Sequence, residues 1–337
     1  MLIAHHQTGY RWGLIFISLS ILMAAFVVSL ACGQYPIPLA RLWDAFLTPD
    51  PGSIDYVILT TTRLSRSVVA CSVGAGLAVA GVLMQSLTRN PLASPAIFGV
   101  NSGAVFFIVL FANFFAVGSP DDYLWIAFSG AAIAGILVYG LGSLGYDGLS
   151  PVRVVLAGAA ISALFMAFTQ GVLVTGQEGV DSVLFWAAGS VSGHELTTVM
   201  PVLPYIWGAI TGSVLLAPHL NILLSGDDIA TGLGQNTGLI KVVMSLFIIS
   251  LAGACVAIAG NIGFIGLIVP HMVRAVVGNH HKWLLILSAF WGAILLLLAD
   301  IASRLVLAPQ EIPIGVMTAA FGAPFFIYLA RKGLQHG

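Results

Sequence analysis

Charged residues are scarce in this chain. Lys, Arg, Asp and Glu together make up 7% of its 337 residues, whereas 59% of the residues are hydrophobic and the mean hydropathy is +1.02. Soluble domains carry about 25% charged residues, so this chain has too few to cover a surface exposed to water. The composition excludes an ordinary soluble fold and predicts an integral membrane protein. The net charge of -1 gives no general attraction to nucleic acid.

Cysteine and catalytic motifs are scarce as well. Cys32, Cys71 and Cys255 all lie inside apolar runs, where small buried side chains are expected rather than a disulfide or a metal site. The chain has no Gly-x-x-x-x-Gly-Lys-Ser/Thr loop for a nucleotide and no aligned Ser/His/Asp or Cys/His set. We therefore predict no catalytic site, no cofactor and no resident metal. If the protein moves a solute, an energising partner is implied.

Apolar runs of about 20 residues, the length that a spanning helix needs, fill most of the chain. We predict an all-α membrane protein with a single polytopic domain over residues 1–337 and about ten spans. Glycines interrupt the third and eighth runs, so nine spans is the alternative count. The first run ends without a small-residue cleavage pattern and is interpreted as a retained span. The predicted spans are residues 12–32, 64–87, 96–117, 123–144, 152–174, 199–217, 239–259, 262–277, 282–305 and 313–330.

The positive residues beside these spans predict the orientation. If both termini are cytoplasmic, eight Lys and Arg residues lie on the inner side and four on the outer side. The inner residues are Arg11, Arg89, Arg153, Lys241, Arg274, Lys282, Arg331 and Lys332. The outer residues are Arg41, Arg63, Arg66 and Arg304. The outer arginines are exceptions to the rule and need a reason.

Two of the runs carry patterns that concern packing and charge. Residues 64–87 contain a stripe of small residues that includes Gly74 and Gly81, for which close helix packing is the favoured explanation. In residues 282–305, Asp300 is the one acid in an apolar run, and an intramembrane carboxylate is a candidate functional group. Arg304 follows four residues later, so we expect an ion pair between the two first and a functional role second.

The run 152–174 has a mildly polar face in a chain where polarity is rare. This face could line a conduit for a solute, or its hydroxyl groups could only form hydrogen bonds between helices. The residues alone favour neither explanation. The face consists of Gly158, Ser162, Phe165 and Thr169.

The interval 220–238, between the sixth and seventh predicted spans, contains a short amphipathic helix that cannot span a membrane. We expect Asp227 to cap this helix and Gly234 to end it. The acids at its start disfavour an anionic lipid surface, so docking to another protein is preferred. The candidate contact residues are Asp227, Asp228, Ile229, Leu233 and Gly234.

Four sequence blocks, in this order, carry a resemblance to a known family. They are Arg63-Leu64-Ser65-Arg66, Asn90-Pro91-Leu92-Ala93-Ser94-Pro95 followed by Asn101-Ser102-Gly103, residues 263–274, and Glu311-Ile312-Pro313-Ile314-Gly315-Val316 followed by Gly322-Ala323-Pro324. From about Pro36 to Gly333, the chain resembles the ten-span permease subunits of type II ATP-binding-cassette importers. That family imports ferric siderophores, cobalamin and haem.

The resemblance implies a multi-pass protein of the bacterial cytoplasmic membrane that is not itself an enzyme. Its implied partners are a second permease subunit, either a copy of this chain or a paralogue, two ATP-binding subunits and a solute-binding protein. A ferric siderophore is the expected cargo, because that branch of the family is the largest. Cobalamin or haem is the alternative cargo, and an ion-coupled secondary transporter is the less favoured alternative class.

The resemblance also implies roles for individual residues. It assigns docking of the solute-binding protein to Arg63, Arg66 and Arg304, for which snorkelling at the membrane interface would otherwise be favoured. It assigns coupling to the ATPase to the helix in 220–238, and the pathway to Gly158, Ser162, Phe165 and Thr169. A cytoplasmic gate is implied at Asn90, Leu92, Pro151 and Val152, although some relatives carry small hydroxyl residues at the last two positions.

Overall fold

Membrane-length helices dominate the architecture. The computed structural model describes residues 2–33, 35, 37–115, 120–145, 149–175 and 188–334, and within these ranges it contains helices and loops but no β-strand. Seven helical segments are long and apolar enough to cross a membrane, and three apolar helices are shorter. The seven are Gly9–Ala31, Ile54–Thr88, Asp122–Ser143, Pro151–Val174, Leu203–Leu223, Thr237–Ala259 and His281–Leu305, and the three are Val100–Phe114, Ile265–Val277 and Ile314–Ile327.

Each predicted span overlaps one of these segments, so the all-helical membrane class is confirmed. The third and eighth predicted spans, which glycines interrupt, are two of the three shorter helices. In chain order the main helices are α1 (Leu2–Ala31), α4 (Leu64–Thr88), α5 (Val100–Phe114), α6 (Pro120–Ser143), α7 (Pro151–Thr175), α10 (Leu203–Leu223), α12 (Thr237–Ala259), α13 (Ile265–Val277), α14 (His281–Leu305) and α15 (Ile314–Leu334).

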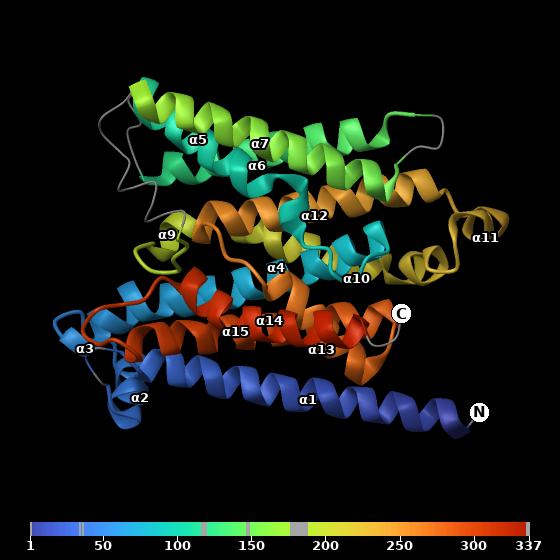
Figure 1. Cartoon of the computed structure of the whole chain (residues 1–337). Coiled ribbons are helices and arrows are strands. Elements are labelled where there is room, and N and C mark those ends of the chain that lie inside the picture. Colours follow the sequence, from blue (N-terminus) through green and yellow to red (C-terminus); the bar gives the residue numbers. More distant parts are fainter. Residues whose placement is uncertain are drawn as a thin grey trace.

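The long helices lie side by side as a bundle with α4 near its centre and α1 and α7 at opposite edges (Figure 1). The apolar stretch of α4 is 89% buried, whereas that of α1 is 22% buried and that of α7 is 28% buried. A helix that is apolar on all sides and largely uncovered by protein is stable in lipid or against another subunit. The edges of the bundle are therefore the surfaces that meet the membrane or a partner.

The two ends of the bundle carry different short elements (Figure 1). The start of α1, the end of α15 and the short helix α11 (Asp227–Gly232) lie at one end, which we call the α11 end. The helices α2 (Leu39–Leu47), α3 (Ile54–Val57) and α9 (Leu196–Val199) lie at the other end, which we call the α2 end. Because α1 begins and α15 ends at the same end of the bundle, the described chain agrees with an even number of crossings.

Glycines bring α4 into backbone contact with two neighbouring helices. A Cβ atom on Gly74 would clash with the carbonyl oxygen of Gly292 in α14, and one on Gly81 would clash with that of Gly266 in α13. Only residues without a side chain allow helix backbones to approach so closely. The packing explanation for the stripe of small residues is thus confirmed.

The second predicted span corresponds to α4, and helical structure continues on its N-terminal side. Before α4 the chain forms α3 and then a π-helical turn, η1 (Ile58–Arg63), which leads directly into α4. The continuous segment Ile54–Thr88 has 35 residues. The predicted start at residue 64 agrees with the first residue of α4, and the polar Thr60-Thr61-Thr62 run before it is also helical. Thr60 and Thr61 donate their hydroxyl protons to the backbone carbonyls of Tyr56 and Val57, respectively.

Candidate functional site

A cluster of buried charges lies at the α2 end of the bundle. Asp300 in α14 is fully buried and binds two guanidiniums, since its Oδ1 is 2.7 Å from Arg66 Nε and its Oδ2 is 2.7 Å from Arg304 Nη2. Arg66 also binds Glu311, with 2.8 Å between Nη1 and Oε2. The predicted pair between Asp300 and Arg304 is confirmed. The second partner of Asp300 was missed because Arg66 is 234 residues away in sequence.

The same cluster caps the end of α1. Arg63 and Arg304 both donate to backbone carbonyls of the last turn of α1 and the residues after it, where a helix leaves its final carbonyls without partners. A cation at this position also interacts favourably with the helix dipole. The acceptors are the carbonyls of Leu30 at 2.7 Å, Ala31 at 2.8 Å and Tyr35 for Arg63, and those of Ser29 at 3.0 Å and Cys32 at 2.9 Å for Arg304.

The three arginines predicted to dock a binding protein thus lie together, but inside the protein. The exposed fractions are 5% for Arg63, 8% for Arg66 and 4% for Arg304. Their donors are used by groups of this chain. The carboxylate of Glu311 is the more accessible member of the cluster, with 34% of its side chain exposed. The accessible part of the cluster is therefore the carboxylate of Glu311, and the three guanidiniums are covered.

The predicted pathway residues on α7 divide into two kinds. Gly158 and Phe165 are buried against the chain itself: a Cβ atom on Gly158 would clash with the carbonyl oxygen of Ile97, and the ring of Phe165 stacks on that of Phe106 with 5.3 Å between the ring centroids. Ile97 belongs to the short helix η2 (Pro95–Phe98). These two residues therefore position α7 against η2 and α5.

Ser162 and Thr169 instead line a pocket of about 420 Å³ beside α7. The Nδ2 of Asn101 donates to the Oδ1 of Asn261 at 2.5 Å across it, and Gln170 contributes a further amide. The polar residues of the lining are all neutral, so the pocket offers hydrogen bonds without a fixed charge. Asn261 was missed in the sequence because it follows the end of α12, with no helical spacing to relate it to α7. The full lining is Ala96, Gly99, Asn101, Ser102, Val105, Ser162, Met166, Thr169, Gln170 and Asn261.

The predicted amphipathic helix exists as α11. Ile229 and Leu233 are 56% and 69% exposed, so they form a bare apolar edge at the end of the bundle. Gly234 follows the helix with a φ of 80°, and its N–H donates to the carbonyl of Thr231 at 2.9 Å, which confirms the predicted end. Asp228 is exposed in the first turn. A short helix with an uncovered apolar edge is suited to protein docking.

The prediction that Asp227 caps α11 was wrong. The capping position is occupied by Gly226, with a φ of 109°, and Asp227 lies in the first helical turn, where a carboxylate is favourable near the helix dipole. Its Oδ1 is 3.0 Å from Arg89 Nη2 and its Oδ2 is 2.8 Å from Lys241 Nζ. Because Arg89 ends α4 and Lys241 belongs to α12, one side chain connects α11 to two core helices.

The predicted gate residues lie at the same end of the bundle. Asn90 follows Arg89 directly, and its Oδ1 accepts a hydrogen bond from the N–H of Leu92 at 2.9 Å, which fixes the turn after α4. Arg89 itself adopts a left-handed conformation with a φ of 50°. Pro151 is the first residue of α7, and Val152 is 67% exposed. The end of α4 and the start of α7 both lie at the α11 end (Figure 1).

Within the described residues, no group of three or more His, Cys, Asp or Glu side chains is arranged to hold a metal ion.

Comparison with known proteins gives full-length matches. The model of the FecCD transport family matches residues 21–332. YfiZ of Bacillus subtilis, described as a siderophore transport system permease protein, is 47% identical over 98% of both chains. The ferric enterobactin transport system permease protein FepD of Escherichia coli is 40% identical over 95% of both chains.

A solved structure shows the same arrangement of helices. A metal-chelate type ABC transporter in an inward-facing conformation superimposes with a TM-score of 0.80 at 30% sequence identity, covering 94% of this chain and 98% of the other.

Proposed function

The chain belongs to the FecCD transport family, and from that premise we propose that it is the membrane-spanning permease subunit of an ATP-driven importer for an iron(III)–siderophore complex. The observation that carries this proposal is the similarity over 98% of the chain to a siderophore permease and over similar lengths to ferric citrate and ferric enterobactin permeases. The proposed location is the bacterial cytoplasmic membrane, with both termini and α11 on the cytoplasmic side.

The proposed pathway runs past the neutral pocket beside α7. A ferric siderophore carries many oxygen atoms that can form hydrogen bonds, and the hydroxyl and amide groups of the pocket can meet them. Because the polar lining has no ionised side chain, it offers no strong ionic contact that would retain a charged complex. Ser162 and Thr169 keep the pathway role that the family resemblance implied. Gly158 and Phe165 support the pathway by positioning α7.

A second permease subunit, either a copy of this chain or a paralogue, is proposed to lie against the exposed side of α7. This side carries large apolar groups at a bundle edge, as expected where a helix meets another subunit or lipid. Together, the two copies of α7 would enclose a conduit. The exposed apolar residues are Val155, Leu156, Leu164, Met166 and Phe168.

The proposed coupling begins at α11. Ile229 and Leu233 insert into a cleft on an ATP-binding subunit, one of two in the assembly. When that subunit moves, the contacts of Asp227 with Arg89 and Lys241 transmit the motion to α4 and α12. Arg89 is the residue before Asn90, so the coupling contact and the proposed gate at Asn90, Leu92, Pro151 and Val152 are neighbours.

The proposed docking region for the solute-binding protein is the charge cluster at the α2 end. The guanidiniums of Arg63, Arg66 and Arg304 are buried, so acidic groups of the binding protein would have to replace Glu311 or Asp300 as their partners. Glu311 holds Arg66 from the accessible side of the cluster, and we propose it as the first partner to be replaced. Binding energy that differs between states in this way is what allows a docked protein to shift a conformational equilibrium.

Cobalamin or haem import is the alternative within the class, because the neutral pocket does not discriminate between bulky ligands. Ion coupling, as in a secondary transporter, has less support. Such a mechanism needs an intramembrane carboxylate that can gain and lose a proton or a cation. Asp300 is the acid inside a predicted span, and it is held by two guanidiniums.

The cargo is tested by binding-protein-dependent uptake into membrane vesicles that contain this chain, with and without a candidate paralogue. Labelled ferric siderophores, haem and cobalamin are supplied in parallel. We expect saturable uptake of a ferric siderophore and none of the other two. Uptake of haem or cobalamin alone would overturn the cargo assignment and leave the importer class intact.

A further inference from the structure

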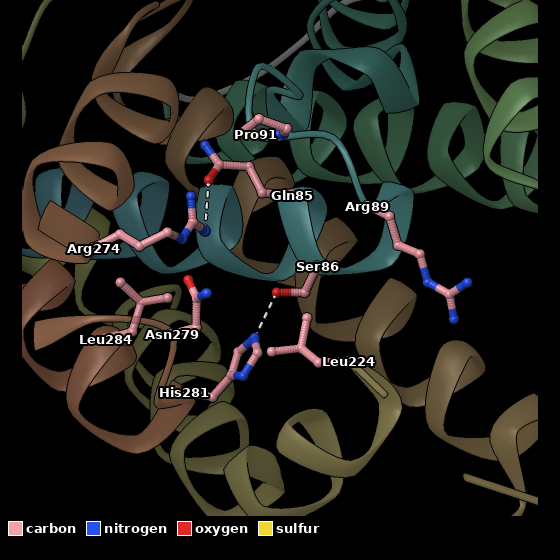
Figure 2. Close-up of a pocket in the computed structure, with 9 residues that line it drawn as sticks. All are labelled: Gln85, Ser86, Arg89, Pro91, Leu224, Arg274, Asn279, His281 and Leu284. Atoms are coloured by element: carbon pink, nitrogen blue, oxygen red, sulfur yellow. Dashed lines mark hydrogen bonds between the residues drawn. The ribbon is translucent and has the colours of Figure 1, made fainter. Parts of the chain in front are cut away.

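A second pocket, of about 330 Å³, lies at the α11 end of the bundle between α4, α10, α13 and α14 (Figure 2). It is separate from the pocket beside α7, with which it shares no lining residue. Pro91, Leu224 and Asn279, which belong to the loops that follow α4, α10 and α13, are exposed and form its mouth. The complete lining is Gln85, Ser86, Arg89, Pro91, Leu224, Arg274, Asn279, His281 and Leu284.

Arg274 is a partly buried guanidinium in this pocket without an acidic partner. Its Nη2 donates to the Oε1 of Gln85 at 3.0 Å, as Figure 2 shows. Among the described residues, no carboxylate lies within ion-pairing distance of it. A guanidinium has five N–H donors, so most of those on Arg274 are available. An uncompensated charge in a partly buried position is costly, and a bound anion would compensate it.

The remaining polar groups of the pocket are mostly occupied by structural contacts. His281 joins three helices, since its Nε2 is 2.8 Å from the Oγ of Ser86 and its Nδ1 is 3.0 Å from the Oδ1 of Asn221. The guanidinium of Arg89 is directed away from the other labelled side chains in Figure 2 and binds Asp227. Arg274 and the amide of Asn279 are therefore the donors that remain for a ligand.

The charge of the surroundings also favours an anion. The lining contains two arginines and no acid. The planar fork of a guanidinium matches two oxygens of a tetrahedral oxyanion, and the pocket is wide enough for a phosphate group. Leu224, Leu284 and Pro91 supply apolar walls that a lipid headgroup with its glycerol could contact.

We propose that this pocket binds a phosphate-class oxyanion through Arg274 and Asn279. Two sources share this chemistry: free phosphate in solution and the headgroup of an anionic membrane phospholipid. The bound oxyanion neutralises Arg274 and joins the end of α13 to the start of α14, next to the turn that carries Arg89 and the proposed gate. This inference stands independently of the cargo and of the direction of transport.

The test measures the thermal unfolding midpoint of the full chain in detergent, followed by tryptophan fluorescence. In one arm, sodium phosphate is titrated against sodium chloride at equal ionic strength. In the other arm, micelles are doped with phosphatidylglycerol or with the zwitterionic phosphatidylcholine. A ligand that binds only the folded state raises the midpoint in a saturable manner. We expect such a rise with at least one anionic source. A response to phosphate identifies a free oxyanion, and a response to phosphatidylglycerol alone identifies the lipid headgroup.

Two variants and a matched control make the test specific. Arg274→Gln and Asn279→Ala, the latter at an exposed position, are each expected to raise the half-saturating ligand concentration at least tenfold over that of the parent chain. The shift of the midpoint is measured for each variant from its own midpoint without ligand. Arg331→Gln removes the same charge from an exposed position of α15 at the α11 end and is expected to respond like the parent chain. The proposal is overturned if neither anionic source raises the midpoint, if Arg274→Gln responds fully, or if Arg331→Gln loses the response equally.

Discussion

At the scale of single residues, buried charge in this chain serves to join helices. Asp300 binds Arg66 of α4 and Arg304 of its own helix, and Arg304 with Arg63 caps α1. In an apolar environment each of these charges is tolerable only because its partners are in place. The cluster therefore fixes the arrangement of three helices at the end where a binding protein is proposed to dock.

Asp300→Asn should destabilise the chain severely. The substitution leaves two guanidiniums buried without their carboxylate, and breaking a buried pair in this way costs about 3–5 kcal/mol. We expect a clearly lower thermal unfolding midpoint in detergent. Asp50→Asn, an exposed acid at the same end, is the control and should unfold like the parent chain. Equal midpoints for both variants would show that the cluster contributes little.

His194 should make stability depend on pH. It lies in the loop before α9, outside the spans, and its backbone carbonyl accepts a hydrogen bond from the Oγ of Ser65 in α4 at 2.6 Å. Burial lowers the pKa of His194 from its usual 6.5, with a smaller opposing effect of a hydrogen bond to the backbone of Ile258. The unfolded chain then binds a proton more readily than the folded one. Stability is full above about pH 6.5 and falls as the pH drops towards the folded-state pKa.

Unfolding midpoints at about pH 5 and about pH 7.5 measure this effect. The difference between the midpoints at the two pH values should shrink in His194→Gln. It should persist in His280→Gln, because His280 is exposed. An unchanged difference in His194→Gln would show that other groups cause the pH dependence.

Residue-level prediction from sequence succeeded where the partners are close along the chain. The four-residue spacing of Asp300 and Arg304 was sufficient to predict their pair. The contact of Arg66 with Asp300 and the capping of α1 by Arg63 depend on tertiary packing. Residue spacing within one helix does not predict such contacts between helices. The docking role of these arginines stays a prediction, and their burial defines what a partner would have to replace.

At the scale of helices, α4 is held by backbone-to-backbone packing. Gly81→Ala places a methyl group against the backbone carbonyl of Gly266, so α4 or α13 would have to shift to relieve the clash. We expect a loss of about 1–3 kcal/mol in stability, seen as a lower unfolding midpoint. Gly208→Ala is the matched control, since a Cβ atom there meets nothing within 4 Å. It should be neutral or slightly stabilising, because alanine favours a helix by up to about 1 kcal/mol over glycine. A harmless Gly81→Ala would contradict the packing account.

The contact between Asp227 and Arg89 should affect coupling more than stability. Both side chains are nearly half exposed, and such pairs contribute up to about 1 kcal/mol. We expect Arg89→Gln to fold normally but to lower the uptake per ATP hydrolysed by up to about fivefold. Arg331→Gln, at the same end, should leave this ratio unchanged. Equal ratios in both variants would show that α11 transmits motion by another route.

The helices themselves were largely predictable, but their facing directions were not. The length and hydropathy of residues 152–174 were sufficient to predict α7. Because most positions of α7 are apolar and its polar face is weak, the sequence did not indicate that Gly158 and Phe165 turn towards η2 and α5. The early start of the segment before α4 was hidden by the threonine run at residues 60–62. Asp227 was expected as a cap because sequence shows residue types but not the φ of Gly226.

At the scale of the whole molecule, the regions proposed for function lie at the two ends of the bundle and beside α7 at one of its edges. The charge cluster lies at the α2 end, α11 and the proposed gate lie at the α11 end, and α7 forms an edge with a neutral pocket (Figure 1). The central helix α4 extends from Arg66 in the cluster to Arg89 beside α11. One buried helix therefore connects the two proposed regions.

The central claim is that this chain imports a ferric siderophore with energy from ATP that a partner subunit hydrolyses. It is tested most directly by the initial rate of labelled ferric siderophore uptake into proteoliposomes that contain the assembled permease and its ATP-binding subunits. We predict uptake only when ATP is enclosed and the loaded binding protein is outside, and strong inhibition when Ser162→Trp fills the pocket beside α7. Uptake that follows an imposed proton gradient without ATP, or that ignores the binding protein, would contradict the account.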